Sequence, residues 1–303
     1  MARFLVSGLA NTETSARVRG FPIPYYPIDY PFFGVETGVS GVGVNVAKAL
    51  AALGHGVTLC SLVGRDAGGR WVKAELERAG IGTEFVRETD GATAAAAVLH
   101  DGEGRRQVHC DLKDLQEREY DFAIAPVEEA DMVVACNIHF SRGLLRRAKD
   151  LGKPVATDVH VLGDPDDAYN REFMAAADVL FLSDEGAGEN PRGLMEALAG
   201  RYGNRVVAMR RGAKGALLLH RGRFTELPAW DVGGARNTVG AGDALFAAFL
   251  HHYARGMAPE EALDRAQLAA AMKIRRSGGG EGFPGAAEWE AEWKKRRGAG
   301  PGV

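Results

Sequence analysis

A carboxylate follows two glycines in segment 237–243 (NTVGAGD), directly before the apolar run 244–250. Because that run leaves no room for a loop, the pattern predicts Asp243 in the first turn of a buried helix. Glycines at 240 and 242 let backbone N–H groups turn toward one point, where the helix dipole adds positive charge. Phosphoryl transfer needs such an anion site, with a carboxylate beside it to accept a proton from the attacking hydroxyl. The alternative interpretation is that Asp243 only caps the helix.

A second glycine-rich segment, 38–47 (GVSGVGVNVA), opens another predicted helix. It fits G-x-G-x-x-A superficially, and Asp66 lies about 20 residues beyond, as a dinucleotide-binding turn requires. Residues 33–37 before it make a poor buried strand, whereas that turn normally follows the first strand of a chain. A nicotinamide-dependent enzyme stays an alternative, with cofactor at 41–47 and no ATP binding. In either case we expect Asn45 to present its amide to a polar ligand.

Several other enzyme classes are excluded by motifs that the sequence lacks. It contains no G-x-x-x-x-G-K-[ST], no H-R-D or D-F-G in a kinase arrangement, no H-E-x-x-H and no G-x-S-x-G. P-loop kinases, protein kinases, zincins and α/β-hydrolases are therefore not expected. Cys60, Cys110 and Cys136 are far apart and lack C-x-x-C spacing, so we interpret them as idle thiols in a reducing cytoplasm.

Composition sets broad limits on partners. Of 303 residues, 46% are hydrophobic and 25% are charged, and 37 basic residues nearly balance 40 acidic ones, for a net charge of −3. A nucleic-acid partner is not expected, because proteins that neutralise a phosphate backbone usually carry a basic excess. No apolar stretch approaches the roughly 18 residues of a membrane span. We expect a cytoplasmic protein with no membrane partner.

Before residue 125 the hydrophobic pattern predicts strands at 3–6 and 57–63 and helices at 45–53 and 68–79. Beyond residue 125 strands and helices alternate regularly, with strands at 132–135, 155–158, 179–182 and 206–209 and helices at 143–151, 172–177 and 192–202. A hairpin at 216–227 precedes a helical C-terminal third. The alternation predicts an α/β fold with a doubly wound, mostly parallel sheet flanked by helices.

Two segments fall outside this alternation and predict a small β-sheet lid. Residues 11–37 contain four prolines among six tyrosines and phenylalanines, which excludes a helix and suits extended segments. Residues 93–112 form a hairpin around the turn 101–104. We expect one domain over 1–303 with lid segments at about 11–37 and 93–112. An exposed aromatic lid face predicts a homodimer through the lid.

These segments together resemble the ribokinase-like (PfkB) carbohydrate and nucleoside kinases, over residues 6 to 284. Segment 237–243 is similar to that family's D-T-x-G-A-G-D motif, and 40–45 to its G-G-x-x-x-N motif. Residues 63–66 with Gly68 are similar to its V-G-x-D-x-x-G motif, and 206–215 to the strand and turn on the ATP side. The resemblance implies a doubly wound α/β domain with a two-segment β lid.

The resemblance also implies site residues. Asp243 would be the catalytic base, beside an anion hole of Gly240, Ala241 and Gly242. The acceptor would lie against Glu13, Gly41, Gly43 and Asn45. Apart from the resemblance, Asn137 is a candidate acceptor contact because it follows the predicted strand 132–135. The nucleotide would lie against Gly212, Lys214, Gly215, Thr238, Gly278 and Gly279, and Mg²⁺ near Asp184 and Glu185.

The sequence departs from the family pattern at four places. Glu13 stands where an Asp is expected, one methylene longer toward the acceptor. Ala187 replaces the Glu of an N-x-x-E motif that orders Mg²⁺, which leaves Asp184 or Glu185 as substitutes. Asn237 replaces an Asp, which weakens a monovalent-cation site, so we expect dependence on Mg²⁺ and little dependence on K⁺. Arg210 stands where a Thr is expected, near the phosphates or on a solvated face.

The sequence therefore predicts an ATP-dependent phosphotransferase that moves the γ-phosphoryl group to a hydroxyl of a small sugar. A nucleoside kinase is the alternative within the class, because the aromatic residues of 25–33 would stack on a base. A non-catalytic ligand-binding relative is the alternative outside it, motivated by Asn237 and Ala187. Arg105 and Arg106 on the lid hairpin would close over a phosphate or sugar, or else lie exposed.

Overall fold

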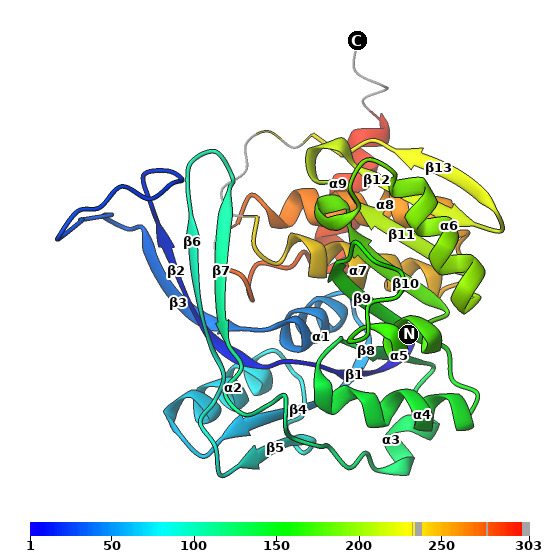
Figure 1. The fold of residues 1–303 in the computed structure, drawn as a ribbon, viewed down its shortest axis with the longest axis horizontal. Helices are drawn as coiled ribbons and strands as arrows, with labels where there is room; N and C mark the ends of the chain where they lie inside the picture. Colours follow the sequence, from blue (N-terminus) through cyan, green and yellow to red (C-terminus); the bar gives the residue numbers. More distant parts are fainter. Residues whose placement is uncertain (232, 234–237, 277, 299–303) are drawn as a thin grey trace.

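A nine-stranded sheet forms the centre of the computed structural model, which describes residues 1–231, 233, 238–276 and 278–298 (Figure 1). Its strand order is β13-β12-β11-β10-β9-β8-β1-β4-β5. The strands β5 to β11 along this order are parallel, and β12 and β13 add an antiparallel edge. The bounds are β1 Arg3–Ser7, β4 Gly56–Gly64, β5 Val86–Thr89, β8 Met132–Ala135, β9 Val155–Val161, β10 Val179–Ser183, β11 Val206–Arg210, β12 Ala216–His220 and β13 Arg223–Leu227.

Helices cover both faces of this sheet, and the strand sequences explain why. In β1, Phe4 and Val6 belong to one apolar core, while Leu5 belongs to the other. Both faces of a parallel strand are buried, so its sequence is continuously apolar. The first core includes residues of α1 Val42–Ala52, α2 Ala67–Arg78, α7 Ala241–Tyr253, α8 Pro259–Lys273 and α9 Ala286–Gly298. The second includes residues of α3 Ile124–Glu129, α4 Arg142–Asp150, α5 Arg171–Ala176 and α6 Pro191–Tyr202. The predicted fold class is confirmed.

A second sheet of four strands stands apart from the first, at the left of Figure 1. It has the order β3-β2-β6-β7, with β2 Asn11–Arg17, β3 Val35–Ser40, β6 Ala95–His100 and β7 Arg106–Asp111. All of β7 is exposed, and the connection between β2 and β3 exposes Tyr25, Tyr30, Phe32 and Phe33. The segments 11–37 and 93–112, which the sequence predicted as lid segments, therefore contribute strands to one sheet.

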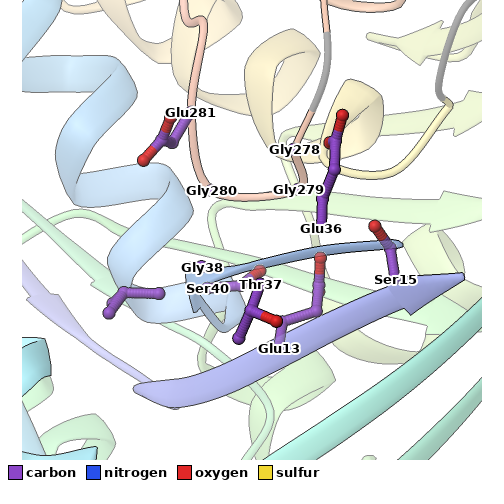
Figure 2. A pocket seen from close by; sticks show the side chains of 11 residues that line it. Glu13, Ser15, Glu36, Thr37, Gly38, Ser40, Gly278, Gly279, Gly280 and Glu281 are labelled. Carbon is purple, nitrogen blue, oxygen red and sulfur yellow. The ribbon is translucent and has the colours of Figure 1, made fainter. Parts of the chain in front are cut away.

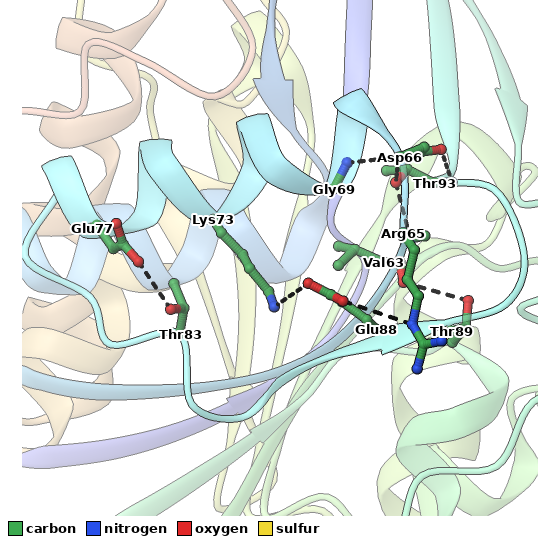
Figure 3. A network of polar contacts seen from close by, with 11 residues as sticks. Val63, Arg65, Asp66, Gly69, Lys73, Glu77, Thr83, Glu88, Thr89 and Thr93 are labelled. Carbon is green, nitrogen blue, oxygen red and sulfur yellow. Dashed lines mark hydrogen bonds and ion pairs between the residues drawn. The ribbon is translucent and has the colours of Figure 1, made fainter.

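A polar network around Asp66 joins this small sheet to the main domain (Figure 3). The Asp66 carboxylate caps α2 by accepting from Gly69 N at 2.8 Å, and it accepts from Thr93 N at 2.8 Å and Thr93 Oγ1 at 2.5 Å. These hydrogen bonds, those from Thr93 first, lower the pKa of Asp66 to about 2. Thr93 lies two residues before β6, so one carboxylate fixes both the start of α2 and the entry into the small sheet.

Two elements are present that the hydrophobic pattern did not predict. Strand β5 consists of Val86, Arg87, Glu88 and Thr89, and its charged residues lie at an edge that one neighbour alone supports. Helix α3 contains Pro126 in its first turn, where a missing N–H is tolerated. Among the described residues, no helix is long and apolar enough to cross a membrane.

Candidate active site

Asp243 occupies the first turn of α7, as predicted, and is nearly buried. Gly240 caps the helix with φ +76°, a left-handed conformation that glycine adopts readily. The carboxylate Oδ2 accepts a hydrogen bond from Asn45 Nδ2 at 2.8 Å. Burial raises the pKa of Asp243, and the bond from Asn45 opposes that shift. A buried carboxylate beside backbone N–H groups at a helix N-terminus can accept a proton next to a bound anion.

Asn45 reaches Asp243 from α1, whose N-terminus packs against the end of β1. Its amide is also within hydrogen-bond distance of Ser40 Oγ, at 3.3 Å. Gly43 belongs to this packing, because a Cβ at 43 would collide with Gly8. Gly41, with φ +104°, faces Leu9 O and the Asn11 side chain. Their packing explains both glycines, and their role in acceptor binding stays a prediction.

Glu13 lies on β2 and points into a cavity of about 320 Å³ between the small sheet and the loop 278–281 (Figure 2). Burial raises the pKa of Glu13, with Asp243 adding to the rise and hydrogen bonds from Ser40 and Gly279 opposing it. Glu13 and Asp243 are therefore close enough to interact electrostatically. The lining residues are Glu13, Ser15, Glu36, Thr37, Gly38, Val39, Ser40, Gly278, Gly279, Gly280 and Glu281.

The glycine loop 278–280 lies against Glu13 of β2, and the nucleotide contact that the resemblance implies for Gly278 and Gly279 stays a prediction. A Cβ at 279 would collide with the Glu13 carboxylate, and one at 280 with Val39 O. A Cβ at Gly240 would collide with Gly279 O. The loop lies between the small sheet and the start of α7, where side chains at 279 and 280 would have no room.

Lys273 is the residue of this site that sequence reasoning missed. It ends α8 and has an exposed fraction of 0%. Its Nζ donates to Val239 O at 3.2 Å and to Gly278 O at 2.6 Å, so it joins the loop before Asp243 to the glycine loop. Burial lowers the pKa of Lys273 to about 8, and the charges of Asp243 and Glu13 oppose that shift. A lysine inside the apolar pattern LAAAMKI (268–274) was the available signal.

Arg210 extends from the end of β11 toward the start of α7. Its guanidinium lies where a Cβ on Gly242 would project. It pairs with the buried Asp158 of β9, with Nη1–Oδ2 at 2.6 Å and Nη2–Oδ1 at 3.1 Å. Of the two interpretations of Arg210, the structure favours the one near the anion site, since its side chain is only 16% exposed.

The residues predicted for nucleotide and metal follow neighbouring strands at the same edge of the sheet. Asp184 and Glu185 begin a short 3-10 turn after β10, and Gly212, Lys214 and Gly215 form the turn between β11 and β12. Ser183 pairs with Arg210, which places these two turns side by side. Gly215, with φ +87°, allows the turn to pack against Leu227 O. Ligands bind open α/β sheets at the carboxyl ends of strands.

The fit of Mg²⁺ rests on Asp184 and Glu185. Among the described residues, neither carboxylate takes part in an ion pair, and no group of three His, Cys, Asp or Glu side chains could hold a metal ion. Mg²⁺ at a nucleotide usually keeps waters and binds one or two carboxylates together with phosphate oxygens. Asp184, which is half-buried at the strand edge, fits that requirement, whereas Glu185 is exposed.

The remaining predicted residues are held by protein contacts. Thr238 Oγ1 accepts from Arg106 Nη1 at 3.1 Å, which links the lid hairpin to the loop before Asp243. Arg105 instead pairs with Asp101 within the hairpin. Asn137 Nδ2 donates to Asn170 Oδ1 at 3.0 Å, so its predicted acceptor contact stays untested. Asn237, on which the monovalent-cation argument rested, lies outside the described residues.

Comparison with known proteins supplies the family. The model of the pfkB family carbohydrate kinases matches residues 1–285. The ATP-dependent ribose-1-phosphate kinase of Halopiger xanaduensis is 30% identical over 290 residues, covering 92% of this chain and 94% of the relative. A putative ribokinase from Agrobacterium tumefaciens has a TM-score of 0.85 at 23% identity, covering 98% of this chain and 99% of its own. The Burkholderia thailandensis nucleoside kinase, solved with inosine, has a TM-score of 0.81 at 18% identity, covering 97% and 98%.

The doubly wound sheet and the separate four-stranded sheet define a ribokinase-like fold. The chain belongs to the pfkB family of carbohydrate kinases. The predictions of an ATP-dependent kinase and of sugar phosphorylation are confirmed, and a nucleoside acceptor stays consistent with the comparisons. The nicotinamide-dependent alternative is wrong, and segment 38–47 instead forms the end of β3 and the start of α1.

Proposed function

We propose that Asp243 is the general base of this kinase and that the backbone of Gly240, Ala241 and Gly242 binds the transferred phosphoryl group. One observation carries the proposal: the Asp243 carboxylate, fixed by Asn45, lies at the N-terminus of α7 and close to Glu13. The raised pKa of Asp243 makes its carboxylate a stronger proton acceptor than an exposed aspartate. In-line transfer would then need positioning and dry electrostatic stabilisation, both of which a buried helix N-terminus supplies.

We propose that the acceptor is a small neutral sugar held by Glu13. The cavity beside Glu13 is lined by three carboxylates (Glu13, Glu36 and Glu281) and three hydroxyl side chains, which accept hydrogen bonds from sugar hydroxyls. No arginine, lysine or aromatic side chain is among the described lining residues, so the lining favours neither a sugar phosphate nor a stacked base. The Halopiger relative is named for ribose 1-phosphate, which makes that compound the essential comparison.

We propose that ATP lies along the ends of β10 and β11, against Gly212, Lys214, Gly215 and Thr238. The turns after β10 and β11 lie side by side at this end of the sheet, and Arg210 reaches from it to the start of α7. Asp184 would hold Mg²⁺ together with water molecules and phosphate oxygens of ATP. The ion would neutralise negative charge on the transferred group. Arg210 would contact the same group as a cation.

We also propose a homodimer through the small sheet and a cytoplasmic location. Strand β7 is an exposed edge strand without a second neighbour, and the connection between β2 and β3 exposes aromatic side chains; a second copy would cover both. The free thiols of Cys60, Cys110 and Cys136 agree with a reducing compartment.

The acceptor proposal is tested by measuring ADP release with MgATP and each of ribose, deoxyribose, fructose, ribose 1-phosphate and inosine. We expect a neutral sugar to give the highest kcat/KM, and Glu13→Gln to lower that value with little change in the KM for ATP. Turnover of ribose 1-phosphate or inosine at least tenfold better than any neutral sugar would contradict the acceptor proposal while leaving the base assignment intact.

A further inference from the structure

The buried ammonium of Lys273 has surroundings that are unusual for a lysine. Along α8, positions 262, 266, 269 and 273 share one face, and the alanines at the first three are buried in the main core. Lysine is almost never fully buried unless it is paired. Among the described residues, no carboxylate oxygen lies within 4.0 Å of Lys273 Nζ. Its partners are backbone carbonyls instead.

The two carbonyls belong to loops that both touch the site. Val239 O lies one residue before Gly240, the cap of α7, and Gly278 O begins the glycine loop against Glu13. The Phe283 ring adds a third contact, with its centroid 5.5 Å from Nζ. The Lys273 side chain also passes beside Gly240, where a Cβ would lie 3.3 Å from Cε. The ammonium thus links the loop 238–240 before α7, called the anion loop below, to the glycine loop 278–280.

A positive charge held by two backbone carbonyl oxygens resembles a bound monovalent cation, since K⁺ is held in proteins by such oxygens. Here the charge is covalently attached to α8 and lies in the field of Asp243 and Glu13. A buried charge costs stability, and an apolar side chain of similar length would fill the same volume without that cost. What the charge contributes here is two hydrogen bonds, to Val239 O and Gly278 O, which an apolar side chain could not form.

We propose that the Lys273 ammonium is a built-in monovalent cation that positions the backbone of residues 238–240 for phosphoryl transfer and makes catalysis independent of K⁺. Lys273 is a positioning residue, because it acts on the anion loop through Val239 O. This inference rests on the proposed role of Gly240, Ala241 and Gly242. It also gives a second physical reason for the expected indifference to K⁺, independent of Asn237.

The wild-type enzyme gives the first test. With acceptor and MgATP, we expect kcat to change less than twofold when KCl replaces tetramethylammonium chloride at equal ionic strength. Activation of tenfold or more by K⁺ would overturn the proposal. An inactive wild-type protein would instead contradict the proposed function, so the two failures are distinguishable.

The variant Lys273→Ala gives the second test, because it removes the charge and leaves a space that a small cation can enter. We expect kcat to fall about 10²-fold, as a misplaced catalytic loop would cause, with a smaller change in the acceptor KM. Addition of KCl, NH₄Cl or methylammonium chloride should raise the kcat of Lys273→Ala at least tenfold. The matched control Lys48→Ala, on α1 with a partly buried stem, should keep wild-type kcat in every salt.

Melting temperature gives a readout that does not require activity. For Lys273→Ala it should rise in KCl relative to tetramethylammonium chloride, and for wild type it should not change. Loss of kcat with no recovery by any salt and no salt effect on melting would show a packing role alone and overturn the proposal. If Lys273→Ala does not fold, Lys273→Met keeps the stem, and kcat above half of wild type in that variant would overturn it equally.

Discussion

Replacement of Asp243 by asparagine separates proton acceptance from every other contribution of this residue. The asparagine Oδ1 can still accept the hydrogen bond that Asn45 Nδ2 now donates at 2.8 Å. The helix cap is unaffected, because Gly240 forms it through its left-handed backbone conformation. Burial opposes the charge of Asp243, so a neutral side chain removes that cost. We expect the free energy of unfolding to change by no more than about 1 kcal/mol.

The substitution Asp243→Asn should mainly lower kcat. General-base catalysis contributes about 10²–10⁴-fold, and each factor of ten corresponds to about 1.36 kcal/mol, so the barrier should rise by about 2.7–5.4 kcal/mol. The affinity for ATP should hold or increase, because the variant removes a negative charge near the γ-phosphate. If Asp243 only fixed the start of α7 through its hydrogen bond with Asn45, asparagine would substitute well and turnover would persist.

The assay is ADP release at saturating sugar and MgATP, with ATP affinity measured by calorimetry. For wild type, kcat/KM should fall as pH decreases through the raised pKa of Asp243, and this acidic limb should be absent in Asp243→Asn. The matched control is Asp131→Asn, whose carboxylate accepts from Arg3 N at 2.7 Å at the opposite edge of the sheet. A kcat above about a tenth of wild type in Asp243→Asn would refute the base assignment.

Three further predictions concern other carboxylates. Glu13→Ala should raise the KM for the sugar at least tenfold more than the KM for ATP, because its contacts lie on the acceptor side; equal changes would contradict this assignment. Asp184→Asn should increase the Mg²⁺ concentration for half-maximal activity severalfold, which a Mg²⁺ titration after EDTA treatment measures, and an unchanged requirement would place the ion elsewhere. Asp66→Ala should lower the free energy of unfolding by about 0.5–2 kcal/mol at pH 7. Since the folded pKa of Asp66 is lowered to about 2, its contribution is complete above its ordinary value near 3.8 and is lost as pH falls toward 2, so a constant difference between wild type and variant from pH 7 to 2 would show that the charge plays no part.

The local sequence determined most of the secondary structure and the position of Asp243, the proposed base. Strands such as β8 and β13 match their predicted ranges because continuous or alternating apolar residues between turns leave few other conformations. Asp243 was located by its immediate neighbours, since two glycines before an apolar run dictate both the tight turn and the helix start. Elements with little apolar content of their own, such as β5, could not be predicted, because their neighbours in the sheet stabilise them.

The tertiary structure decided which residues share the site. The glycine loop 278–280 gives no sign in the sequence that it packs on Glu13 and Gly240, more than 200 and nearly 40 residues away. The pairing of Arg210 with Asp158 likewise depends on the order of β9, β10 and β11 in the sheet. Lys273 marks the limit of local reasoning most clearly. Its charge on an apolar helix face conflicts with the pattern around it, and the conflict is resolved by two carbonyl oxygens that folding brings from loops 34 and 5 residues away. Local propensity acts over a few residues, whereas a site of buried charges is stable only where distant backbone supplies the partners that water would otherwise provide.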